Sequence, residues 1–147
     1  MTTTIRTAIL INATPDKVWR VLTDFPSHPQ WNPLFTSIEG SGTPGQPLDI
    51  KFRQGIRLRP LVTMARKGET FEWLGKLLFG GLFDGRHRFE LHEEGAQTRL
   101  VHSESFCGLL VPLLNKLLDD TERGFVAFND AIKRRVEGQD EWQEKLD

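Results

Sequence analysis

The final third of this 147-residue chain constrains its fold most, because a strand-like segment there leads into one long amphipathic helix. From Pro112 to Val136, apolar residues recur at intervals of three, four and their sums, which places them along one stripe of a helix. At about 1.5 Å per residue, this helix would be roughly 37 Å long, enough to cross a small domain. The preceding segments have the patterns of strands and turns, so the sequence predicts one long helix packed on a sheet.

The composition favours one soluble domain. There are 19 Lys and Arg residues against 20 Asp and Glu residues, without a basic block, so nothing indicates a nucleic acid partner. The single cysteine, Cys107, excludes an intramolecular disulfide and fits a reducing compartment. The first residues lack a signal-peptide pattern, and no apolar run approaches the ~18 residues of a membrane span. We therefore expect a cytoplasmic protein without stable membrane insertion.

Two short helices are predicted between the first two strands. Residues 5–11 have strand character, and Thr14 can cap a helix whose first position is Pro15. That helix should end near Asp24, and residues 28–33 allow only a short helical turn.

Six further strands are expected, which makes seven in all. Apolar and charged residues alternate along most of them, so one face of the sheet should be apolar. The segments are residues 35–38, 48–53, 56–64, 71–77, 83–92 and 98–106.

The Gly80-Gly81 pair suggests a two-residue hairpin, but the side-chain alternation argues against it. Such a turn would place the inward Trp73 opposite the outward Arg88, and paired residues must share a face. We therefore expect an odd-length loop or a bulge. Residues 77–83 would form either a flexible apolar flap or an ordinary packed hairpin end.

Several short motifs in a fixed order carry a resemblance to a known family. They are Ala13-Thr14-Pro15-Asp16-Lys17-Val18-Trp19, Leu22-Thr23-Asp24-Phe25, Trp31-Asn32-Pro33, Gly85-Arg86-His87-Arg88-Phe89, Thr98-Arg99-Leu100 and the segment from His102 to Leu109. Over about residues 3–136 the chain resembles the polyketide cyclase/dehydrase and lipid-transport superfamily, which is START-related and shares the birch-pollen-allergen fold. His28 is a departure, since the family often has an aromatic residue there.

The resemblance implies an α+β helix-grip fold with an internal cavity. A curved seven-stranded antiparallel sheet would wrap around the C-terminal helix, and residues 1–136 would form one ligand-binding domain. Residues 137–147 would form a polar tail, either a frayed helix or disordered. The superfamily includes lipid carriers, hormone receptors, cyclases and co-chaperones, so the fold does not define one function.

Three inward-facing residues are the candidates for acid–base chemistry. His87 alternates with Gly85 and Phe89, whereas His102 and Glu104 alternate with apolar residues of the last strand. They could form the polar end of an apolar pocket, orienting a ligand carbonyl or hydroxyl or removing a proton. A structural hydrogen-bond pair is the simpler interpretation.

No metal site or cofactor is predicted, because the histidines and the carboxylate lack a compact ligand spacing. Cys107 has no Cys-His motif around it, and a small buried residue is a better interpretation than a nucleophile.

The predicted ligand-binding residues lie on the inward faces of the strands and on the helix stripe. Inward glycines would leave room for a ligand or would allow close packing of helix and sheet. The set is Phe52, Leu58, Phe71, Trp73, Gly75, Gly85, His87, Phe89, His102, Glu104, Leu117, Gly124, Phe125 and Phe128.

Three functions are compatible with these features. The first is binding or transport of a hydrophobic small molecule such as a lipid, a polyketide-like aromatic or an isoprenoid. The second is a cyclase/dehydrase-type enzyme in which His102 or His87 removes a proton and Glu104 holds the imidazole tautomer. The third is a protein-interaction module, and an exposed edge strand would also support a homodimer.

Overall fold

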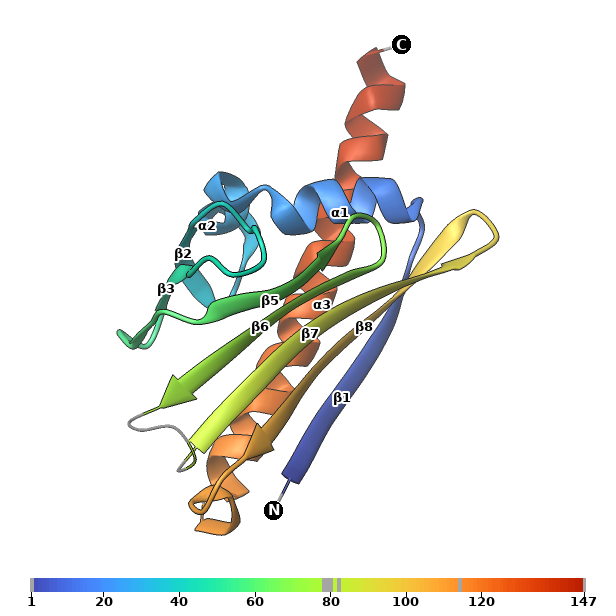
Figure 1. Cartoon of the computed structure of the whole chain (residues 1–147). Coiled ribbons are helices and arrows are strands. Elements are labelled where there is room, and N and C mark those ends of the chain that lie inside the picture. The colour runs from blue at the N-terminus through green and yellow to red at the C-terminus, as the bar shows by residue number, and fades with distance from the viewer. Residues whose placement is uncertain (1, 78–80, 82, 114, 147) are drawn as a thin grey trace.

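A computed structural model describes residues 2–77, 81, 83–113 and 115–146 (Figure 1). The strands are β1 (Thr2–Ile11), β2 (Phe35–Glu39), β3 (Asp49–Phe52), β4 (Arg57–Leu58), β5 (Leu61–Arg66), β6 (Thr70–Leu77), β7 (Phe83–Glu94) and β8 (Gln97–Cys107). The helices are α1 (Pro15–Thr23), α2 (His28–Trp31) and α3 (Asn115–Leu146), with 3-10 turns at Phe25–Ser27 and Val111–Leu113.

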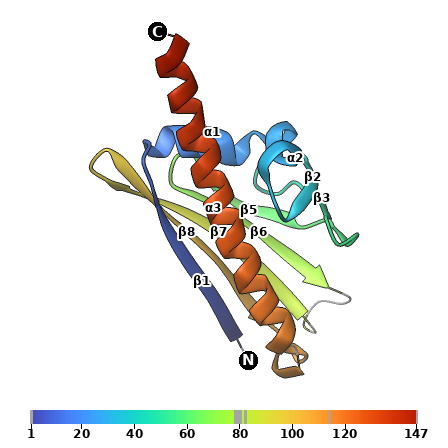
Figure 2. The same ribbon diagram turned by 180° about the vertical axis from the view of Figure 1, so that it is seen from behind.

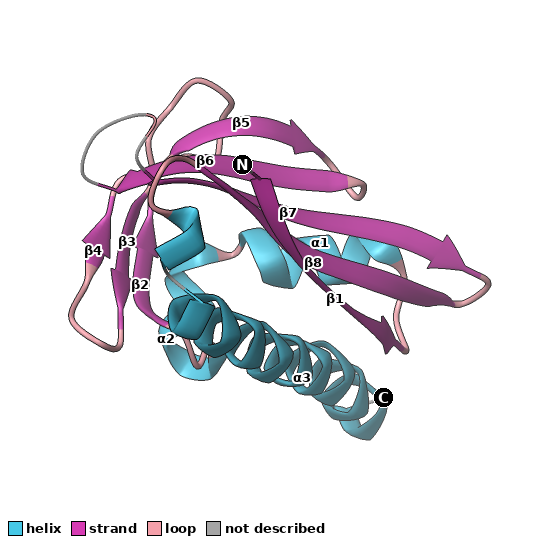
Figure 3. Cartoon of the chain, turned by 90° about the horizontal axis from the view of Figure 1, so that it is seen from below, coloured by secondary structure: helices cyan, strands magenta, loops and turns pink. Residues whose placement is uncertain are grey.

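A curved antiparallel sheet and the long helix α3 form the body of the molecule. The larger sheet has the order β1-β8-β7-β6-β5, and a smaller sheet has the order β2-β3-β4. Helix α3 runs diagonally across the concave face of the larger sheet, and α1 crosses one end of it (Figures 2 and 3). The predicted α+β architecture, with its short helices between the first two strands, is confirmed.

The predicted strand count was wrong. The described residues form eight strands in two sheets rather than seven in one. The expected strand over residues 56–64 is split at Pro60 into β4 and β5, because proline has no N–H group for a ladder hydrogen bond. An isolated β-bridge joins Leu61 of β5 to Pro47, which lies just before β3.

The boundaries of the helices follow from local chemistry. The Thr14 side chain accepts a hydrogen bond from the Lys17 amide at 3.4 Å, and Pro15 occupies the first turn, as expected. The long helix, predicted to start at Pro112, begins at Asn115 in the structure, and a 3-10 turn over Val111–Leu113 precedes it. Helix α3 continues through most of the predicted tail. In that extension, Glu137 accepts hydrogen bonds from the Asn12 amide at 3.0 Å and from Lys133 at 2.6 Å.

The connection between β6 and β7 has an odd length, as predicted. Leu77 pairs with Phe83, and Trp73 pairs with His87, so five residues separate the two strands and the inward residues share a face. The proposed apolar flap falls on residues 78–80 and 82, which lie outside the described part of the chain.

Aromatic and aliphatic side chains of the concave face pack against the apolar stripe of α3. Phe128 and Ile132 are fully buried there, together with Phe71, Phe89 and Leu100 of the sheet. Cys107 ends β8 and is exposed, so the expectation of a buried cysteine was wrong. It follows the inward Phe106, and successive strand residues point to opposite faces.

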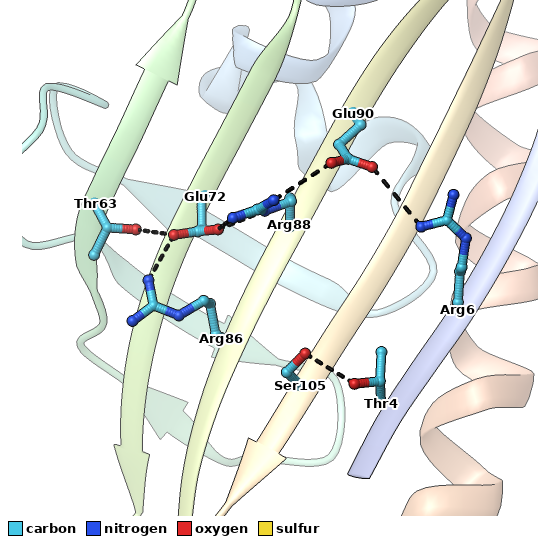
Figure 4. A network of polar contacts seen from close by, with 8 residues as sticks. All are labelled: Thr4, Arg6, Thr63, Glu72, Arg86, Arg88, Glu90 and Ser105. Atoms are coloured by element: carbon cyan, nitrogen blue, oxygen red, sulfur yellow. Dashed lines mark hydrogen bonds and ion pairs between the residues drawn. The ribbon is translucent and has the colours of Figure 1, made fainter. Parts of the chain in front are cut away.

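The convex face contains a buried carboxylate that the alternation pattern assigned to a solvated surface. Glu72 is only 2% exposed. It accepts hydrogen bonds from Thr63 at 2.8 Å, Arg86 at 2.6 Å and Arg88 at 2.5 Å (Figure 4). Burial by itself would raise the pKa of Glu72, but these three hydrogen bonds together hold that pKa below its ordinary value. The carboxylate therefore links three adjacent strands.

Replacing Glu72 should destabilise the protein more than replacing an exposed glutamate with a similar partner. Glu72→Gln removes the negative charge between Arg86 and Arg88 and replaces one acceptor oxygen by an NH2 donor that would face an arginine. We therefore expect the free energy of unfolding to fall by roughly 1–3 kcal/mol. Glu94→Gln is the matched control. Glu94 binds Arg99 through both of its oxygens, but this pair is exposed at the end of β7. Urea denaturation measures both, and equal shifts in midpoint would contradict the role of Glu72.

Candidate functional site

A cavity of about 320 Å³ lies between the concave face of the larger sheet, the small sheet and the first half of α3. Apolar and aromatic side chains form most of its wall. The predicted residues that line it are Phe52, Leu58, Trp73, Gly75, Gly85, His87, Glu104, Leu117, Gly124 and Phe125.

Sequence reasoning missed other parts of the wall, which come from loops, from strands β2, β6 and β8, and from the edge of the helix stripe. These are Pro33, Leu34, Phe35, Arg53, Gln54, Ile56, Lys76, Phe106, Asp120 and Thr121. Four predicted residues belong instead to the packed core beside the cavity, namely Phe71, Phe89, His102 and Phe128. Phe71 and Phe89 pair with each other two positions beyond the Trp73–His87 pair, where Phe128 of α3 covers the sheet.

The three predicted glycines line the cavity, but their surroundings differ. A Cβ at Gly75 would meet only ordinary van der Waals contacts, the nearest at 3.8 Å, so a side chain can be added there without a clash at the Cβ. A Cβ at Gly85 would lie 2.5 Å from a Glu104 carboxylate oxygen, and one at Gly124 would lie 2.9 Å from the Leu34 side chain. Gly85 therefore accommodates Glu104, and Gly124 allows close packing of Leu34 on the helix.

The candidate acid–base residues form a connected chain at the inner end of the cavity. Glu104 Oε2 lies 3.4 Å from His87 Nδ1, and the Nε2 atoms of His87 and His102 are 2.6 Å apart. Trp73 stacks on the His87 ring, with centroids 4.5 Å apart and planes at 21°. Of the three residues, His87 and Glu104 line the cavity, whereas His102 is fully buried behind His87.

Burial determines the charge of His102. Desolvation, assisted by the neighbouring His87, holds the pKa of His102 well below its ordinary value, although a hydrogen bond with Asn129 opposes the shift. His102 is therefore neutral, and both of its ring nitrogens already have partners, His87 and Asn129.

Asn129 and Thr7 complete the chain and were missed by the sequence analysis. Asn129 Oδ1 lies 3.0 Å from His102 Nδ1, and Asn129 Nδ2 donates to Thr7 Oγ1 at 2.9 Å. A signal for Asn129 was present in the sequence. It follows Phe125 by four positions on the apolar stripe of α3, so it is a polar residue on the face directed to the core.

His28, the first residue of the expected short helical turn, is a buried structural residue at the start of α2. Its Nε2 atom donates to the Leu22 carbonyl oxygen at 2.8 Å, and its Nδ1 atom accepts from Asn32 Nδ2 at 3.0 Å. Desolvation lowers the pKa of His28, against smaller opposing effects of the Leu22 carbonyl and Asp24. The contact between His28 and Asn32 holds the turn that leads into β2, and neither residue lines the cavity.

Two negative findings apply to residues 2–77, 81, 83–113 and 115–146. No group of three or more His, Cys, Asp or Glu side chains there is arranged to hold a metal ion. In the same part of the chain, no helix is both long and apolar enough to cross a membrane.

A family model for polyketide cyclase / dehydrase and lipid transport matches residues 2–137. The chain belongs to this family. The resemblance inferred from the motifs is thus confirmed. A search of functionally curated proteins gave no match.

Several solved structures share the fold at low sequence identity. Protein MLL2253 from Mesorhizobium loti is 17% identical, with 93% of this chain and 98% of that chain covered and a TM-score of 0.77. A norcoclaurine synthase point mutant from Thalictrum flavum, in complex with a transition-state analogue, is 17% identical, with coverage of 95% and 97% and a TM-score of 0.76. A START superfamily protein from Mycobacterium smegmatis is 19% identical, with coverage of 92% and 98% and a TM-score of 0.70. These likenesses confirm the helix-grip fold and show nothing beyond it.

The buried neutral histidines His28 and His102 predict a loss of stability in mild acid. The folded-state pKa of each lies below the 6.5 of an ordinary histidine, so the unfolded chain binds protons first as the pH falls. The stabilisation is therefore complete above about pH 6.5 and is lost progressively below it, by at most about 1.4 kcal/mol per pH unit for each histidine. Urea denaturation between about pH 7.5 and pH 5.5 measures this slope.

His28→Gln should make the dependence on pH shallower, because it removes one of the two histidines. His92→Gln is the control, since the His92 side chain is 56% exposed. A slope that is the same in wild type and both variants would contradict the assignment.

Proposed function

We propose that this family member binds a hydrophobic small molecule in the cavity between the sheet and α3. The observation that carries the proposal is a cavity with largely apolar walls and one polar pair, His87 and Glu104, at its inner end. Binding sites for small molecules have this composition, in which apolar burial supplies affinity and a few polar groups fix orientation.

The size of the cavity favours a compact ligand. Its volume of about 320 Å³ lies near the lower end of the range of roughly 300–1,000 Å³ for ligand pockets. A molecule of one to three fused or linked rings fits such a space better than a long-chain lipid does. Aromatic side chains on the wall, including Trp73, Phe52 and Phe125, would pack against such rings.

The rim of the cavity offers a route for entry. Ile56 and Leu117 belong to the wall and are 50% and 42% exposed. Ile56 lies in the turn between β3 and β4, and Leu117 lies in the first turn of α3. Exposed apolar residues at a cavity mouth would favour the transfer of a poorly soluble molecule.

A cavity-filling variant tests the proposal. Gly75→Val adds a branched side chain at a cavity-lining position where the Cβ meets only ordinary contacts, without the clash expected at Gly85 or Gly124. Titration with the neutral fluorescent probe N-phenyl-1-naphthylamine should show saturable binding to wild type. The variant should lose roughly tenfold or more in affinity, the effect of one misplaced methylene in an apolar pocket.

Gly138→Ala is the control, because Gly138 lies on α3 away from the cavity wall, and a methyl group added there would meet no atom within 4 Å. If wild type and Gly75→Val bind N-phenyl-1-naphthylamine with equal affinity, the probe binds outside the cavity and the proposal is contradicted. No saturable binding by wild type would contradict the proposal and would favour the protein-interaction hypothesis.

A proton-transfer enzyme is the second candidate function, and one observation favours it. The imidazole of His87 and the carboxylate of Glu104 both line the largely apolar cavity, and such a pair can act as acid and base. His102 does not reach the cavity, so its contribution would pass through His87.

Hydrogen–deuterium exchange of 2-tetralone tests this candidate, because its acidic protons lie next to a carbonyl group. An acid–base site should accelerate the exchange in D₂O by about 100-fold or more, and Glu104→Gln should abolish the acceleration. Thr121→Val is the control, since it changes the cavity wall without removing an ionisable group. Exchange at the same rate with and without protein would leave binding as the function.

A further inference from the structure

We infer that the inner end of the cavity takes an uncharged ligand that presents a hydroxyl group to Glu104 and His87. The inference rests on the proposed ligand-binding function and specifies the ligand. Thr7 and Asn129 act as positioning residues for this site, because they determine which nitrogen of His87 carries a proton.

The hydroxyl group of Thr7 sets the orientation of Asn129. It has a single proton, which it donates to the His102 carbonyl oxygen at 2.8 Å. Its oxygen can then only accept from Asn129, and the amide nitrogen of Asn129 lies 2.9 Å away. The amide oxygen of Asn129 must therefore face His102 Nδ1, at 3.0 Å.

The tautomers of both histidines follow from this orientation. An oxygen acceptor at His102 Nδ1 requires a proton on that nitrogen, and a neutral imidazole carries only one. His102 Nε2 is then an acceptor, and the group 2.6 Å from it is His87 Nε2, which must donate. When His87 is neutral, its proton is on Nε2, and the lone pair of Nδ1 faces Glu104.

Glu104 and His87 Nδ1 can therefore hold one shared proton. With that proton the pair has no net charge and offers a ligand both a donor and an acceptor. The separation of 3.4 Å is longer than the roughly 2.7–2.9 Å of a closed charge-assisted hydrogen bond. A ligand oxygen can thus contact both groups. A hydroxyl group fits because it both donates and accepts. A carboxylate cannot donate, and its charge would be repelled by the Glu104 carboxylate whenever the shared proton resides on His87.

The other charged residues of the cavity wall are either bound to another group or exposed to solvent. The guanidinium of Arg53 donates twice to the Asn32 carbonyl oxygen, at 2.8 and 3.2 Å. Lys76 and Asp120 are exposed residues. The Glu104 side chain is only 17% exposed, so it is the carboxylate that a ligand buried in the cavity would meet.

Three probes of equal ring size test the ligand class in the full-length protein. Naphthalene, 2-naphthol and 2-naphthoate should each displace the fluorescent probe, with 2-naphthol binding roughly five- to tenfold more tightly than naphthalene. In wild type, 2-naphthoate should bind at least about tenfold more weakly than 2-naphthol, because burial of a carboxylate beside Glu104 is unfavourable.

Glu104→Gln removes the negative charge and should reduce the difference between 2-naphthol and 2-naphthoate at least about fivefold. Glu122→Gln makes the same change of charge at an exposed position of α3 away from the cavity wall and should leave that difference within about twofold. Equal binding of 2-naphthol and 2-naphthoate by wild type, or equal effects of the two variants, would overturn the inference. If naphthalene does not bind at all, the proposed function fails and the inference fails with it.

The role of Thr7 is tested by the nitrogen-15 chemical shifts of the His87 ring, which report the tautomer directly. At the high-pH end of a titration, wild type should show His87 with its proton on Nε2. Thr7→Val removes the acceptor that holds the Asn129 amide, so the two tautomers of His87 should mix. Thr4→Val is the matched control on the same strand, where the hydroxyl pairs with Ser105 on the opposite face (Figure 4).

A merely structural role for Thr7 would change stability without moving these shifts. The inference on positioning is supported if the His87 shifts change in Thr7→Val and not in Thr4→Val. It is overturned if Thr7→Val retains the wild-type tautomer, or if wild type carries the proton on Nδ1.

Discussion

The packing of α3 against the concave face of the sheet is the interaction on which the rest of this structure depends. Phe128, Ile132 and Val136 of the helix are buried against the sheet, so this half of the interface is a close-packed core. The cavity exists because the same interface is left incomplete beside the first half of the helix. Gly75 lacks the side chain that would fill the space there, and the small sheet forms a third wall.

The close-packed half and the open half of the interface meet at a polar chain. Thr7, Asn129, His102, His87 and Glu104 connect β1, α3, β8 and β7 through a series of contacts of 2.6–3.4 Å. A buried polar group costs free energy unless it has a hydrogen-bond partner. Asn129, His102 and His87 each have two partners within this series. Glu104, at one end of this series of polar contacts, borders the cavity, where a ligand could supply a further partner.

The convex face shows the same principle without a cavity. Glu72 is as buried as the core residues, but three donors from neighbouring strands satisfy its oxygens and leave no direction for a ligand. Glu72 and the partly buried Glu104 therefore differ in how completely the protein satisfies them. Glu72 has a structural role that is complete within the protein, whereas the closest partner of Glu104 is a single histidine at 3.4 Å.

Much of the fold could be predicted from the sequence because it depends on periodicity. The alternation along β6, β7 and β8 identified their inward faces, and the helical stripe identified the core-facing side of α3. The strand count failed at Pro60, where a missing N–H group divided one predicted strand. The buried state of Glu72 was also missed, since alternation gives the face of a residue and not what covers it.

What the sequence by itself determined is which residues face inward, and hence that His87, His102 and Glu104 share an apolar environment. Only the tertiary structure decided that His102 belongs to the core while His87 and Glu104 border the cavity. The physical reason is that a cavity depends on how far the helix and the small sheet close over the inward face, which is set by contacts between distant segments. The pairing of Thr7 with Asn129, 122 residues apart, is such a contact.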